Sequence, residues 1–143
     1  MDEAQKALVT ISGLHGAEQG GEPIQFATEG KFSRRGQAFK IEYEESELTG
    51  MAGTKTTIIA NSKTVAMKRT GSVESYLSFS LGKKQHSYYN TEFGSFVVGI
   101  DPYEMEIELN GFGGRIHIGY NIELDHAPTG TNVLDVMVRP IFV

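Results

Sequence analysis

Two charged residues of opposite sign continue the apolar faces of two expected strands. The apolar side of segment 39–43 runs on to Glu45, and that of segment 65–67 runs on to Arg69. A carboxylate and a guanidinium that each extend an inward face would lie near one rim of a barrel, where they could pair. The alternative is that both strands have left the core at these positions, so that the two charges are solvated.

Other residue patterns give no catalytic signature. The chain has no cysteine, which excludes disulfides, thiolate metal sites and a cysteine nucleophile. The Gly-Phe-Gly-Gly segment at 111–114 resembles a phosphate-binding loop, but such a loop opens a helix and a strand is expected here. We therefore predict no catalytic residue and no cofactor.

The four histidines are scattered along the chain: His15, His86, His117 and His126. No two of them have the two- or four-residue spacing that puts both rings on one face of an element. Asp125 and His126, near Pro128, could bind a metal with a ligand from elsewhere, but a solvated turn is the preferred interpretation. We predict no metal site, and the alternation of its strand places His117 on the outer face.

Alternation of apolar and polar residues dominates the chain, most clearly in segments 103–109 and 115–124. This is the period of a half-buried strand. It predicts a set of large inward-facing side chains: Phe26, Phe39, Ile41, Met67, Leu77, Phe79, Phe93, Met105, Ile107, Ile116, Ile118 and Ile122.

Short turns separate these segments, for example Arg35-Gly36, Asn110-Gly111 and Pro128-Thr129-Gly130. They divide the chain into about ten short strands, and short connections require antiparallel pairing. A long meander with one apolar face closes on itself, because closure removes its exposed edges. We expect an all-β, antiparallel up-and-down barrel of about 8–10 strands, in preference to a Greek-key sandwich.

Glycine is abundant, at 17 of 143 residues, and supports this fold. Gly30, Gly94, Gly99 and Gly119 fall inside strand patterns, where a sheet bends to close. No change of composition marks a linker, so residues 1–143 are predicted to form a single domain.

Charge and hydropathy bear on partners and location. Lys and Arg number 13 and Asp and Glu 18, a formal net charge of −5, which argues against binding nucleic acid through its phosphates. The acidic start at 1–4 lacks the apolar region of a secretory signal, and the apolar runs are too short to span a bilayer. We expect a cytoplasmic protein with no nucleic-acid or membrane partner.

Four segments, in order, carry a family resemblance: Tyr43-Glu44-Glu45, 65–71, Tyr89-Asn90-Thr91-Glu92-Phe93-Gly94, and 114–120. Together with the opening strand and segment 26–30, they resemble the YwiB-like family of small bacterial proteins of unknown function. The resemblance implies a calycin-type, lipocalin-like barrel and no known activity. The chain departs from lipocalins and fatty-acid-binding proteins, which carry a Gly-x-Trp motif, because it has no tryptophan.

Three functional hypotheses remain. The first is a non-enzymatic barrel that binds a small anionic or amphipathic ligand. The second is a filled barrel that acts through its surface as a protein-interaction or regulatory module, for example as a homodimer. The third is an enzyme that acts on a small anionic substrate through Arg69 and Glu45. The candidate ligand-binding residues, most of which could equally be packed in the core, are Tyr43, Glu45, Arg69, Tyr89, Thr91, Phe93 and Tyr120.

Cavity volume discriminates between these hypotheses. A cavity of about 300 Å³ or more beside Arg69 would favour ligand binding. A filled interior would favour a protein that works through its surface.

Overall fold

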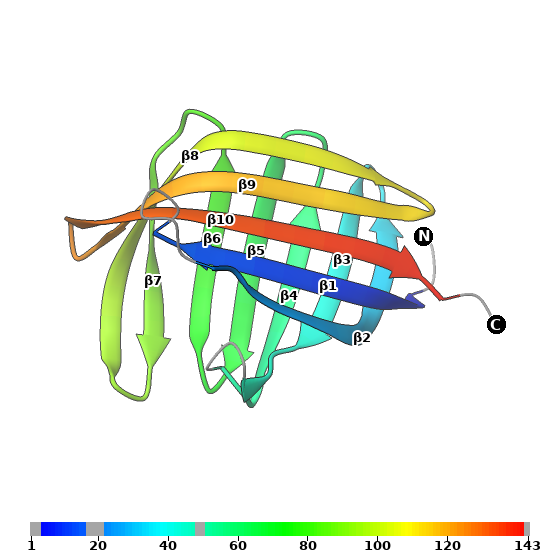
Figure 1. The fold of residues 1–143 in the computed structure, drawn as a ribbon, viewed down its shortest axis with the longest axis horizontal. Coiled ribbons are helices and arrows are strands. Elements are labelled where there is room, and N and C mark those ends of the chain that lie inside the picture. The colour runs from blue at the N-terminus through cyan, green and yellow to red at the C-terminus, as the bar shows by residue number, and fades with distance from the viewer. Residues whose placement is uncertain (1–3, 17–21, 48–50, 142–143) are drawn as a thin grey trace.

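The computed structural model describes residues 4–16, 22–47 and 51–141, except for the side chain of His15. These residues form ten antiparallel strands in one closed barrel (Figure 1). The strands are β1 (Gln5–His15), β2 (Ile24–Arg35), β3 (Ala38–Glu44), β4 (Thr54–Ala60), β5 (Thr64–Gly71), β6 (Glu74–Ser80), β7 (Gln85–Thr91), β8 (Gly94–Asn110), β9 (Gly113–Leu124) and β10 (Ala127–Pro140).

Each strand pairs with its neighbours in sequence, and β1 pairs with β10 to close the circle. The prediction of an antiparallel up-and-down barrel is therefore confirmed. Strands β1, β9 and β10 cross the molecule at a steep angle to β3–β7 (Figure 1). None of the described residues forms a helix of the length and apolarity needed to cross a membrane.

The contacts between neighbouring strands differ greatly in length. β8 and β9 stay paired from Val98 with Leu124 to Asn110 with Gly113, across one bulge. β6 and β7 share only two residue pairs, Glu74 with Asn90 and Ser75 with Tyr89. The wall of the barrel is thus continuous but has one short seam, between β6 and β7.

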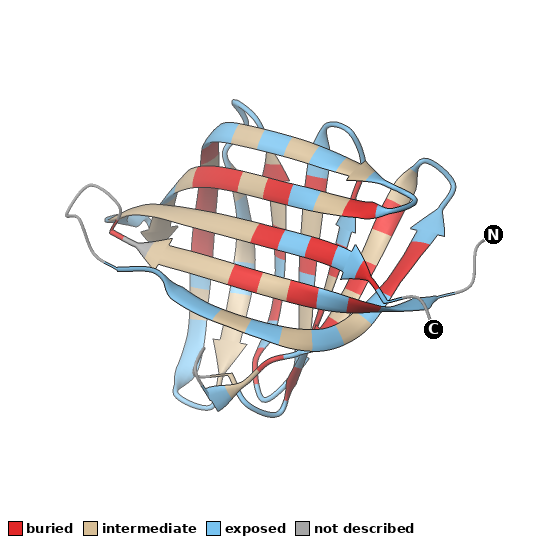
Figure 2. Ribbon diagram, turned by 45° about the vertical axis from the view of Figure 1, so that its right-hand side comes forward, coloured by how far each residue is buried: buried red, intermediate tan, exposed pale blue. Residues whose placement is uncertain are grey.

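The interior is built from rows of side chains that face each other across successive strands. One row is Ile41, Ile58, Met67 and Leu77 on β3 to β6, and a second is Phe39, Ala60, Val65 and Phe79. All eight are buried. Along the strands, buried residues alternate with exposed or half-buried ones (Figure 2), which is the alternation that the sequence predicts.

Two sequence-based predictions are wrong: that Phe93 faces inward, and that residues 128–130 form a hairpin turn. Phe93 lies at the turn between β7 and β8 and is 86% exposed, because β7 ends at Thr91 before the alternation reaches it. The hairpin between β9 and β10 turns at Asp125 and His126, whereas Pro128–Gly130 forms a bulge inside β10. The other predicted inward residues belong to the core or pack against it.

Gly30 shows why the barrel needs a residue without a side chain in the middle of β2. A Cβ atom there would lie 2.3 Å from the carbonyl oxygen of Glu42 and 3.0 Å from Val9. Pairing of β2 with β3 begins one residue later, at Lys31 with Glu42. Gly30 therefore allows β2 to pass close over β3 at the point where the two strands come together.

Candidate functional site

A row of polar side chains lies one inward step beyond the apolar row of Ile41 and Ile58. Its members face each other across five successive strands and are partly or wholly buried: Tyr43, Thr56, Arg69, Ser75 and Tyr89. We call this row the polar belt. It marks the level at which the inside of the barrel changes from apolar to polar.

Glu45 and Arg69 form the charged pair at this level. Arg69 Nε lies 3.6 Å from Glu45 Oε2, and the two side chains are only 13% and 2% exposed. The backbone N–H of Glu45 donates to the carbonyl of Thr54 at 2.8 Å, which holds Glu45 against β4. The hydroxyl of Thr56 also donates to Glu45 Oε2. Of the two interpretations that the sequence left open, the structure supports the one in which both charges continue inward faces and meet.

Two polar atoms of the polar belt lack a hydrogen-bond partner. They are Arg69 Nε and Ser75 Oγ. Within the described part of the chain, these two are the buried side-chain nitrogen and oxygen atoms that have no hydrogen-bond partner. Arg69 and Ser75 are directly opposite each other on β5 and β6. A buried polar group without a hydrogen-bond partner is costly, so both positions have unused hydrogen-bonding capacity.

A cavity of about 320 Å³ opens beside Arg69 at this end of the barrel. It exceeds the volume of about 300 Å³ that favours ligand binding. Its polar lining combines Arg69, two carboxylates, Glu22 and Glu45, and the side chains of Tyr43, Tyr120 and Asn132. Its apolar lining comes from β1, β2, β10 and the loop before β4: Ile11, Leu14, Ile24, Met51, Val133 and Leu134.

The two tyrosines of the cavity are neutral hydrogen-bonding groups. Burial, followed by the neighbouring Glu45 carboxylate, raises the pKa of Tyr43. Burial also raises the pKa of Tyr120, whose hydroxyl accepts a hydrogen bond from Asn132 Nδ2 at 3.4 Å. The ring of Tyr120 packs edge-on against Phe79 at 5.2 Å between centroids, which ties the cavity wall to the core.

The structure brings together four of the seven predicted site residues. Tyr43, Glu45, Arg69 and Tyr120 all line the cavity. Tyr89 lies just behind them, with its hydroxyl 3.6 Å from the sulfur of Met51, which is a lining residue.

Thr91 and Phe93 lie elsewhere. The Thr91 hydroxyl accepts from the Phe93 N–H at 3.1 Å and donates to the Gly94 carbonyl at 3.2 Å, so it stabilises the β7–β8 turn. With Phe93 exposed at the same turn, neither residue faces the cavity. Both predicted positions are therefore corrected.

Sequence reasoning missed Ser75, Asn132 and Met51. Asn132 precedes Leu134, Val136 and Val138 at intervals of two residues, so alternation along β10 could have placed it inward. Ser75 likewise precedes Leu77 and Phe79 on β6. No comparable signal marks Met51, because it lies in a loop.

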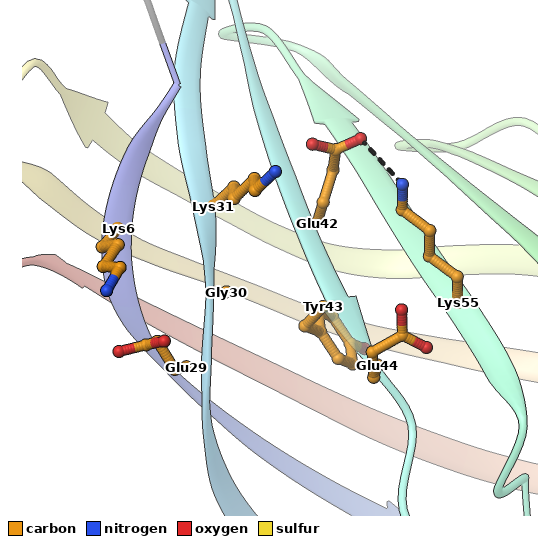
Figure 3. Close-up of a pocket in the computed structure, with 8 residues that line it drawn as sticks. All are labelled: Lys6, Glu29, Gly30, Lys31, Glu42, Tyr43, Glu44 and Lys55. Atoms are coloured by element: carbon orange, nitrogen blue, oxygen red, sulfur yellow. Dashed lines mark ion pairs between the residues drawn. The ribbon is translucent and has the colours of Figure 1, made fainter.

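A second hollow, of about 240 Å³, lies on the outer face of β1 to β4 (Figure 3). Charged side chains of both signs surround it, and Tyr43 lines both this hollow and the cavity. Lys40 and Lys55 lie 3.2 Å and 3.4 Å from Glu42 Oε1. Burial acts to raise the pKa of Glu42, but these two ammonium groups outweigh it and the pKa is lowered. The ammonium and carboxylate groups around this hollow therefore offset each other in charge.

Two histidine clusters occur on the outer surface. His117 lies between two carboxylates, with Nδ1 2.7 Å from Asp135 and Nε2 2.8 Å from Glu104. His86 and His126, far apart in sequence, lie together with Glu123, and one ligand atom from each falls within 4.8 Å of the others. The sequence indicated a metal role for His126 only if a ligand came from elsewhere in the chain. The fold brings two side chains of suitable type, those of His86 and Glu123, next to it.

The fold and site define a closed ten-stranded barrel with a cavity at one end. Residues 9–136 match the family model described as Domain of unknown function (DUF1934), and the chain belongs to this family. The crystal structure of the ywiB protein from Bacillus subtilis is similar, with a TM-score of 0.84 at 17% identity over 99% of this chain and 96% of that one. The comparison with curated proteins gave no match.

Proposed function

We propose that the protein binds a small amphipathic molecule in the cavity, with an oxygen-containing anionic head group at Arg69. The observation that carries the proposal is the pair of buried atoms without hydrogen-bond partners: Arg69 Nε, on a residue that lines the cavity, and Ser75 Oγ, on the residue opposite it on β6. A carboxylate oxygen of a ligand accepts from both groups and removes the cost of leaving them unpaired.

Charge at the head-group position supports a small acceptor. Glu45 Oε2 is shared between Arg69 Nε, at 3.6 Å, and the hydroxyl of Thr56. The guanidinium has five N–H groups in a planar fork, so it can hold Glu45 and a ligand at once. The hydroxyls of Tyr43 and Tyr120 stay protonated, since burial raises the pKa of both.

The apolar walls define the other part of the ligand. Ile11, Leu14, Ile24 and Leu134 line the cavity without offering side-chain hydrogen bonds. Its volume of about 320 Å³ is at the small end of ligand sites, which span about 300–1,000 Å³. A short aliphatic chain fits this space. The cavity favours ligand binding over the alternative of a filled barrel that acts through its surface.

Gly13 allows a clean test of the site. It lines the cavity, and a Cβ atom there would meet nothing within 4 Å. Gly13→Leu should therefore fill the cavity without disturbing the wall. Gly111 is the matched control, because its Cβ position is equally open but lies at the turn between β8 and β9.

The experiment measures binding of decanoate and of decanol to the full chain by isothermal titration calorimetry. We expect decanoate to bind at least about tenfold more tightly than decanol, and Arg69→Met to remove that preference. Gly13→Leu should abolish binding of both, whereas Gly111→Leu should bind as the parent does. Equal binding by Gly13→Leu and the parent, or no binding of either compound by the parent, would contradict the proposal.

A further inference from the structure

His86, Gly99 and Glu123 lie in one row across the outer face of three strands. His86 on β7 is opposite Gly99 on β8, and Gly99 is opposite Glu123 on β9. Strands β7 and β9 are not neighbours, so their side chains are about 10 Å apart at the backbone and are normally separated by the residue between them. Here His86 Nε2 reaches to 3.9 Å from Glu123 Oε1.

Gly99 makes this approach possible. A Cβ atom at Gly99 would lie 3.1 Å from Glu123 Oε1 and 3.3 Å from His86 Nε2. Gly99 has no positive φ angle, so its backbone does not require glycine. The missing side chain instead leaves room for the carboxylate and the imidazole to meet above the strand.

His126 completes the cluster from the turn between β9 and β10. Its ring centroid lies 5.4 Å from that of His86. Asp125 and His126 both have positive φ angles, 50° and 72°, as a two-residue hairpin turn of this type requires. Glycine adopts such angles without strain, whereas a histidine is strained there. The chain thus holds an imidazole over His86 at a position where glycine would be less strained.

We propose that His86, Glu123 and His126 form a binding site for a divalent transition metal, with Zn²⁺ the expected ion. Two imidazoles and one carboxylate are a ligand set that zinc accepts, and they leave a fourth position for water or a small anion. In a tetrahedral site the ligand atoms lie about 3.4 Å apart, because each bond is about 2.0–2.1 Å. The three atoms lie within 4.8 Å of one another, and we expect side-chain rotations to bring them to this spacing when an ion binds.

The surroundings of Glu123 favour its role as a ligand. Lys84 Nζ binds Oε2, while Oε1 faces His86. Asp125 Oδ1 accepts from the Val97 N–H at 2.9 Å, which fixes the turn that carries His126. Groups beyond the ligands that orient them in this way raise metal affinity.

A hollow of about 300 Å³ adjoins Glu123 on the same outer face. Gly99 and Glu123 line this hollow together with Lys84, Asp101 and Asn121. An anion bound to the metal would therefore have an ammonium group and an amide within the same hollow. This site is separate from the cavity, since no residue lines both.

The experiment titrates the full chain with zinc chloride in a calorimeter and with Co²⁺ in a spectrometer. We expect one Zn²⁺ per chain and the intense visible absorption of tetrahedral Co²⁺. His86→Ala, His126→Ala and Glu123→Gln should each weaken Zn²⁺ binding by about 100-fold or more, because each removes a ligand. All three positions are on the outer surface, so the variants should stay folded.

Gly99→Val gives an independent variant that keeps every ligand. Its side chain would displace Glu123 and His86 and should weaken Zn²⁺ binding at least about tenfold, whereas Gly111→Val should have no effect. His117→Gln controls for removal of a histidine at another site and should leave binding unchanged. Absence of Zn²⁺ binding by the parent would overturn the proposal. So would binding that persists in His86→Ala or is lost in His117→Gln.

Discussion

The apolar row of Ile41, Ile58, Met67 and Leu77 and the polar belt beside it differ in what they contribute. They lie on the same strands, one inward step apart. The apolar row is fully packed, whereas the polar belt contains Arg69 Nε and Ser75 Oγ without hydrogen-bond partners in the described structure. The barrel thus places its buried apolar layer and its unpaired polar atoms at different levels of the same strands.

The largest effect should come from the apolar row. Ile58 is fully buried between Ile41 and Met67, so Ile58→Ala should lower the free energy of unfolding by about 3–4 kcal/mol. Ile59, the next residue, is 45% exposed on the outer face. Ile59→Ala should cost less than about 1 kcal/mol. Urea denaturation measures both, and equal losses would show that this row is not the packed layer.

The charged pair beside the polar belt should give the next largest effect. Arg69→Met leaves the Glu45 carboxylate, only 2% exposed, without its cation and should cost about 3 kcal/mol. Glu45→Gln/Arg69→Met removes both charges and should return to within about 1 kcal/mol of the parent. The same denaturation measurement tests this. If the double variant loses as much as the two single variants combined, the pair does not act as a coupled unit.

The smallest effect should come from His117 on the outer wall. Its hydrogen bond to Glu104, and then that to Asp135, raise its pKa above 6.5. The stabilisation is therefore complete below the unfolded pKa and is lost as the pH rises through the folded pKa. It should amount to less than about 1 kcal/mol, because the group is near the surface. Denaturation from pH 5 to 8 of the parent and His117→Gln measures it, and a parent that gains stability as the pH rises relative to the variant would contradict the assignment.

The fold could be predicted because alternation is a local property of the sequence. It placed Ile41, Met67 and Phe79 inward, and its extension offered a Glu45–Arg69 pair as one of two interpretations, the one that the structure supports. It failed for Phe93 because alternation does not reveal where a strand ends.

The candidate sites depend on register, which no single segment contains. Ser75 is part of the polar belt because it pairs with Arg69 and Tyr89 on two different strands. His86 and Glu123 meet only because Gly99 lies between them in the sheet. His86 and Glu123 are far apart in the sequence, and rules for the spacing of metal ligands consider only residues that are close in sequence. Such rules therefore could not detect this contact.

The short seam between β6 and β7 has a consequence for local opening of the barrel wall. Two residue pairs hold this seam, while every other junction in the barrel has at least five. Local opening costs the least free energy where the fewest hydrogen bonds break. We therefore expect the barrel wall to open first between β6 and β7. One of the two residue pairs of this seam is Ser75 with Tyr89, and both residues belong to the polar belt. The same fluctuation that parts the strands therefore exposes the inner polar groups to solvent.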